Sequence, residues 1–89
     1  MLTLPAVVTH AQAHQTARGL TAQVGAEAAS VVLDASALTQ FDSSALAAML
    51  ACRRGALAAG KTFAVYGLPA RLSQLAALYG VAELLPSAL

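Results

Sequence analysis

The stretch SVVLDASALTQFDSSAL, residues 30–46, decides the fold that we expect for this chain. Ser30-Val31-Val32-Leu33-Asp34 is apolar, rich in β-branched residues and bounded by polar ones, which indicates a buried strand. Residues 35–41 are predicted to form a loop. Asp42-Ser43-Ser44 then supplies side chains that cap helices, and the apolar residues that follow recur at helical spacing. A strand, a loop and a helix that ends near Gly60 are therefore predicted.

Strands and helices alternate on both sides of this stretch. Leu2-Thr3-Leu4 alternates as a short strand does, and Thr9 with Gln12 is a capping-box pattern that begins a helix ending near Gly25. The remaining predicted elements are a strand at residues 62–66, a helix at 69–80, and a last strand or an irregular tail at 81–85. This order predicts an α/β fold, with a mixed, mostly parallel sheet of about four strands and helices packed on it. The length fits a single domain over residues 1–89.

The composition is unusually apolar. Hydrophobic residues make up 58% of the chain and charged residues only 10%, whereas ordinary domains carry about 25% charged residues. Disordered chains combine low hydrophobicity with high net charge, so this composition argues against disorder. It also predicts that part of the apolar surface is covered by a partner.

The charges and the apolar runs exclude several classes of protein. The formal net charge is +1, and the chain has no Trp, so a basic stripe with interleaved aromatic residues for nucleic acid is not expected. The longest uninterrupted apolar run, residues 45–52, is far shorter than the ~20 residues that cross a bilayer. We see no secretory signal, and the single cysteine fits a reducing cytoplasm.

Two parts of the sequence resemble the core of the STAS domain family. Val31-Val32-Leu33-Asp34, followed after a loop by Phe41-Asp42-Ser43-Ser44-Ala45-Leu46, is similar to the family's strand ending in Asp and its D-[ST]-x-G-L helix start. Gly60 to Gly67 looks like the family's next strand. The resemblance covers roughly residues 30–85 well and residues 2–24 loosely. It implies a STAS-like α/β fold.

The resemblance implies a role in binding another protein. The family includes the small cytoplasmic subunit of a phospholipid-transporting ABC system of the Mla type, and residues 78–86 are similar to the tail of that subunit. The implied function is to bind and stabilise the system's ATPase subunit, in the cytoplasm and peripheral to the inner membrane through that partner. The transported lipid is left open. The alternative is an anti-sigma factor antagonist that binds an anti-sigma kinase and is switched by phosphorylation of a serine, which Ser43 matches.

The expected interface is the start and the exposed side of the second helix. Its predicted partner-binding residues are Asp42, Ser43, Ser44, Ala45, Ala48 and Arg53. A phosphate on Ser43 would lie at a helix N-terminus and add nearly two negative charges to a weakly charged surface. From local pattern alone, Asp42-Ser43-Ser44 is better explained as an ordinary helix cap, because such caps are common.

The sequence departs from the family pattern in two places. Ala45 stands where the family commonly has glycine, which affects how closely a partner approaches the helix start. The family usually begins with a β-hairpin, of which only the second strand is recognisable here, at residues 2–4. An open sheet edge is relieved by pairing between chains, so homodimerisation is a further expectation.

Catalysis, metal binding and cofactor binding are not expected. Ser43, His10 and Asp34 form a Ser-His-Asp triad only on paper, since no GxSxG elbow is present. His10 and His14 are four residues apart, but no carboxylate or cysteine near them in sequence would complete a metal site. The chain has no glycine-rich phosphate loop. A small hydrolase is therefore only a formal third hypothesis.

Overall fold

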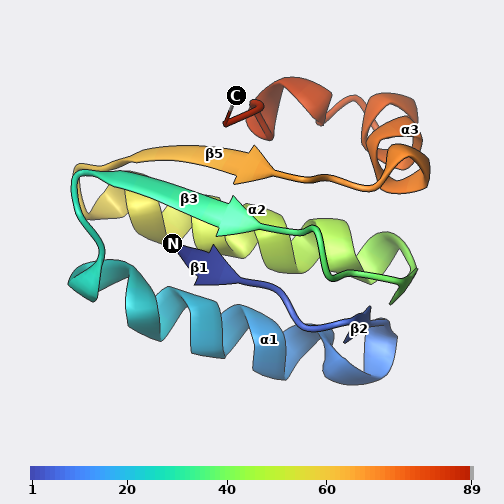
Figure 1. Ribbon diagram of the computed structural model, residues 1–89, viewed down its shortest axis with the longest axis horizontal. Helices are drawn as coiled ribbons and strands as arrows, with labels where there is room; N and C mark the ends of the chain where they lie inside the picture. The colour runs from blue at the N-terminus through green and yellow to red at the C-terminus, as the bar shows by residue number, and fades with distance from the viewer. Residues whose placement is uncertain (89) are drawn as a thin grey trace.

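The computed structural model describes residues 1–88, and its central sheet contains three strands in the order β1-β3-β5 (Figure 1). These strands are β1 (Leu2–Thr3), β3 (Ser30–Asp34) and β5 (Thr62–Tyr66), and a separate pair joins β2 (Val7–Val8) to β4 (Gln40–Phe41). All of these pairings are parallel. The predicted α/β architecture is confirmed. The strands form these two parallel sets, however, instead of one mixed sheet of about four strands.

Within residues 1–88, three α-helices and two short 3-10 helices lie between and after the strands. They are α1 (His10–Gln23), η1 (Val24–Ala26), α2 (Ser43–Ala58), α3 (Ala70–Leu78) and η2 (Ala82–Leu84). The predicted capping box is present at the start of α1, where the Gln12 side-chain oxygen accepts a hydrogen bond from the Thr9 backbone N–H at 3.0 Å. After α2, Gly60 adopts a φ of 75°, a left-handed conformation that favours glycine and turns the chain into β5.

The helices α1 and α2 run side by side and in the same direction (Figure 1). α2 lies behind β3 and β5, and α3 lies beyond the end of β5. Leu33 of the sheet, Met49 of α2 and Leu72 of α3 are fully buried and belong to one core. Lys61, which precedes β5, holds the segment that follows α1, because its Nζ donates to the carbonyl oxygens of Val24 at 2.9 Å and of Glu27 at 2.5 Å.

The end of the described chain resolves the alternative left open by the sequence. Residues 82–84 form η2, and no strand begins there. The tail then returns to the sheet: the Val65 N–H donates to the Pro86 carbonyl at 2.8 Å, and the Ala88 N–H donates to the Val65 carbonyl at 2.9 Å. These bonds align Ser87 with Val65 in an isolated parallel bridge. The tail therefore covers the outer edge of β5.

The opposite edge of the sheet is formed by β1. This strand pairs only with β3, and within residues 1–88 no strand pairs with its outer side. β1 contains two residues, so the open edge offers few backbone groups to another chain. The homodimer expected from an open edge stays a prediction.

Candidate functional site: the outer face of α2

One carboxylate joins the starts of α1 and α2. Asp42, the N-cap of α2, accepts a hydrogen bond from the Ser44 N–H on Oδ1 at 2.8 Å and from the His10 N–H on Oδ2 at 3.0 Å. The geometry follows from the β2–β4 pair, which aligns Val8 with Phe41 and so places the two helix starts next to each other. The backbone N–H groups of Ser44 and then His10 lower the pKa of Asp42 below its ordinary value. Within the domain, this predicted contact residue therefore positions the helix start.

Ser43 is the first residue of α2, and its side chain is exposed. Within the described residues, its hydroxyl has no hydrogen-bonding partner. Ser44 is half-buried and is held through its backbone by Asp42. A free hydroxyl at a helix N-terminus, where the helix dipole is positive, is well placed for a contact or for a phosphate. The structure thus leaves Ser43 accessible at the predicted site.

Ala45 and Ala48 lie on the inner side of α2. They are 0% and 1% exposed and belong to the core, in which Cys52 and Ala56 continue the same row of small side chains at 0% exposure. Their small size lets α2 approach the sheet and α1 closely. Neither alanine has surface to offer a partner, so we correct the predicted contact set by removing both. The glycine that the family has in place of Ala45 would likewise face the core here.

The surface of α2 is carried by other residues. Ser43, Ala47, Leu50 and Arg54 follow one another at intervals of four, three and four residues, which places them on one face of the helix. Ala47 and Arg54 are exposed, and Leu50 is half-buried. The predicted contact residues do not include Ala47, and of the adjacent pair Arg53-Arg54 they include only Arg53. The positions of Ala47 and Arg54 around the helix could have identified them, because they lie away from the side of α2 that carries the buried Leu46, Met49 and Cys52.

Exposed large apolar side chains also lie near the end of α2 and, separately, on α3. Arg53 is half-buried, and Leu57, four residues further along α2, is 47% exposed. On α3, Leu78 is 78% exposed, and a shallow hollow of about 280 Å³ is lined by Arg71, Gln74, Leu75 and Leu78. Large exposed apolar side chains next to arginines are typical of protein interfaces. Whether Arg53 contacts a partner stays a prediction.

The other candidate residues are not brought together by hydrogen bonds. Asp34 is occupied locally: its Oδ1 accepts from the Ser36 hydroxyl at 2.6 Å and the Ser36 N–H at 2.9 Å, which lowers its pKa. No hydrogen bond within residues 1–88 links it to His10 or Ser43. In the same residues, no group of three or more His, Cys, Asp or Glu side chains could hold a metal ion. Cys52 is buried.

The protein is a small α/β module in which α1 and α2 pack on a parallel sheet. An exposed serine follows the N-cap of α2, and the candidate binding surface is the outer face of that helix. A family model described as "Mlab, STAS domain" matches residues 1–86. The chain therefore belongs to the STAS domain family. STAS domains are generally binding and regulatory modules, which supports a regulatory or accessory role. None of the curated proteins compared matches the chain. In the part that the structure describes, no helix is both long and apolar enough to cross a membrane.

Proposed function

We propose that the chain is the STAS-domain accessory subunit of a phospholipid-transporting ABC system and that it binds the ATPase subunit through the outer face of α2. The observation that carries the proposal is this face, defined as Ser43, Ala47, Leu50 and Arg54, which combines a free helix-start hydroxyl, apolar surface and an arginine. The description of the matching family model, which names the Mla type, supports the transporter partner.

The chemistry of the face suits a lasting complex. Ala47 lets another backbone approach closely, Leu50 adds apolar area, and the exposed Arg54 can donate several hydrogen bonds. Asp42 holds the start of α2 through its bonds from Ser44 and His10, and so fixes where Ser43 lies. The geometry of the interface therefore depends on Asp42, and a direct contact of its carboxylate with the partner stays a prediction.

A second function is favoured by one feature, the accessible Ser43 hydroxyl. An anti-sigma factor antagonist needs a serine that a kinase can reach, and a phosphate at this helix start would be stabilised by the N-terminal dipole. The two functions use the same face, so only the identity of the partner separates them. We rank the transporter subunit first because of the family description.

The experiment that tests the proposal is affinity capture of the tagged chain from its native host, followed by mass spectrometry. Recovery of an ABC ATPase together with its permease supports the proposal. Recovery of an anti-sigma kinase instead would overturn it in favour of the second function. The matched control is Ala47→Arg, which leaves the fold intact and should lose the specific partner while retaining background proteins. A partner that survives this substitution contradicts the interface.

A further inference from the structure

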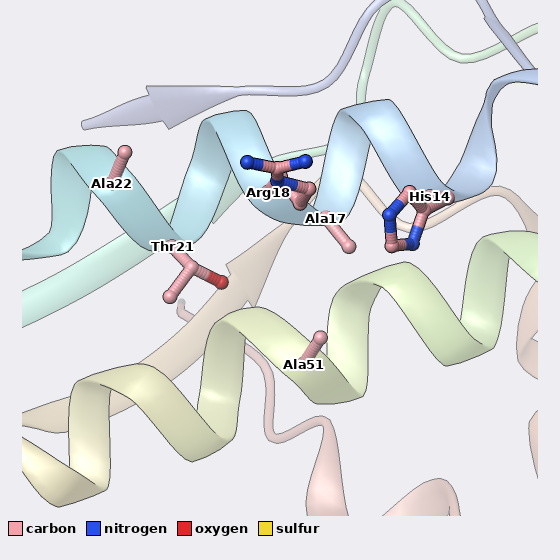
Figure 2. Close-up of a pocket in the computed structure, with 6 residues that line it drawn as sticks. All are labelled: His14, Ala17, Arg18, Thr21, Ala22 and Ala51. Carbon is pink, nitrogen blue, oxygen red and sulfur yellow. The ribbon is translucent and has the colours of Figure 1, made fainter.

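An open groove of about 500 Å³ runs between α1 and α2, beside the outer face of α2 (Figure 2). It is lined mainly by apolar atoms of His14, Ala17, Arg18, Thr21, Ala22 and Ala51. Figure 2 shows Ala17 and Thr21 directed from α1 toward α2, and Ala51 directed back toward α1. Its walls are therefore short side chains, and the guanidinium of Arg18 lies on its rim.

The small size of these residues has a structural origin. The two helices approach so closely that a Cβ added at Gly55 would lie 3.2 Å from Thr21 Cγ2. On the solvent side of this contact, alanines occupy the facing positions of both helices, so the surface between the helices is hollow. The groove is thus a fixed product of how α1 and α2 pack, and it needs no movement to open.

The charge around the groove has one sign. Neither α1 nor α2 contains Asp or Glu, whereas Arg18 of α1 lines the groove and Arg54 of α2 follows the lining residue Ala51 by one turn. Asp42, the N-cap of α2, accepts from backbone N–H groups, and Glu27, which follows η1, is paired with the Met1 amino group at 2.9 Å. That ion pair is the one found among residues 1–88, so these arginines have no acidic partner within the domain.

Two kinds of occupant fit these observations poorly. A small molecule binds where most of its surface can be enclosed, and this groove is open to solvent along the helices. A second copy of the chain, related by twofold symmetry, would bring Arg18 and Arg54 of one copy against the same residues of the other. Like charges opposed across an interface are costly.

We propose that the α1–α2 groove binds an acidic amphipathic helix of a partner protein. The apolar side of that helix would lie over Ala17, Thr21 and Ala51, in the helix-in-groove mode that peptide-binding proteins use. Its Asp or Glu residues would pair with Arg18 on one side and Arg54, one turn beyond Ala51, on the other. Apolar contact then supplies the affinity, and the charges set the orientation and the choice of partner.

The test uses the isolated domain and two synthetic peptides. Each is a helix of about five turns with an Ala/Leu seam, one flanked by Glu and the other identical except for Lys. The glutamate peptide should shift the amide NMR signals of Ala17, Thr21 and Ala51, and the lysine peptide should bind at least about tenfold more weakly. Arg18→Glu should weaken the glutamate peptide about tenfold, whereas Arg71→Glu, the same charge change on α3, should leave it unchanged.

Three results would overturn the proposal. They are equal binding of the two peptides, signal changes confined to other elements, and equal effects of Arg18→Glu and Arg71→Glu. Shifts at the same amides caused by monomeric oleate but not by the glutamate peptide would assign the groove to a lipid chain and also contradict it. No ATPase enters this test, so its failure leaves the proposed function standing, and a failed capture experiment leaves the groove proposal standing.

Discussion

The inner and outer faces of α2 are built from the same residue type and do opposite things. Ala45 and Ala48 on the inner face are 0% and 1% exposed and let the helix pack closely on its own domain. Ala47 on the outer face is exposed and packs on nothing within residues 1–88. A small side chain thus allows close approach on both faces, toward the core on one and, in the interface that we propose, toward a partner on the other. The position of each alanine around the helix decides on which face it lies, and the residue type alone does not.

The two faces should differ most strongly in how they tolerate the same substitution at the adjacent positions 47 and 48. Ala48→Arg places a charged side chain in a site that is 1% exposed, so we expect the domain to unfold, with a loss of more than about 4 kcal/mol. Ala47→Arg, the matched control one residue earlier, should change the free energy of unfolding by less than about 0.5 kcal/mol. Circular dichroism with thermal unfolding measures both. A folded Ala48→Arg variant with an unchanged Tm would contradict the assignment of the faces.

The side of α2 that faces α1 should respond less strongly. A side chain at Gly55 meets Thr21, so Gly55→Leu should overpack the α1–α2 contact and cost about 1–3 kcal/mol in urea unfolding. Gly19→Leu on α1 is the control, since nothing lies within 4 Å of a Cβ there. It should stabilise the helix slightly, because leucine has the higher helix propensity. Equal effects of the two substitutions would show that α1 and α2 are not in close contact.

The junction that presents the outer face should be sensitive to acid. The folded-state pKa of Asp42 is lowered by the N–H groups that it caps, so its contribution to stability is complete above the ordinary carboxyl pKa of about 4 and is lost as the pH falls through the lowered value. Asp42→Asn should therefore be less stable than the parent at pH 7 and lose less stability between pH 5 and pH 3.

Urea midpoints at several pH values measure this difference. Asp34, whose pKa is lowered by Ser36, should preserve part of the acid sensitivity in the Asp42→Asn variant. An identical pH profile for parent and variant would refute the double-capping role.

The inner face should also protect its cysteine from reaction. Burial, aided by the negative charge of Glu27, raises the pKa of the Cys52 thiol to about 11. Because the thiolate is the reactive form, Cys52 of the folded domain should react with a disulfide reagent at pH 8 at least about a hundredfold more slowly than in denaturant. Fast labelling of the folded domain would mean that α2 exposes its inner face.

Much of the fold could be predicted because its signals are local. The β-branched run of β3, the Asp42 cap and the strand at Thr62–Tyr66 each carry their own pattern, and the structure contains all three. The parallel β2–β4 pair could not be predicted, since two residues on each side give no periodicity and the pairing joins distant parts of the chain.

The burial of the predicted contact residues was anticipated only in part, for a related reason. Ser43 and Arg53 were placed on accessible or half-buried surface, as the structure has them, whereas Ala45 and Ala48 were assigned to the wrong side of α2. In a helix this rich in alanine, both faces carry small apolar side chains. The sequence pattern therefore predicts the helix, but it hardly indicates which face is turned toward the core. The hydrogen bond that Asp42 accepts from the His10 N–H depends on tertiary structure and could not be predicted from a local sequence pattern.

The central claim is that the outer face of α2 binds the ATPase subunit of a transporter. It is tested most directly by the affinity of the purified domain for that purified ATPase, measured by titration calorimetry for the parent, Ser43→Glu, Ala47→Arg and Ala77→Arg. We predict losses of at least about tenfold for the first two substitutions and none for Ala77→Arg, the same change at an exposed position of α3. Unchanged affinity in Ser43→Glu and Ala47→Arg, with both variants folded, would contradict the account.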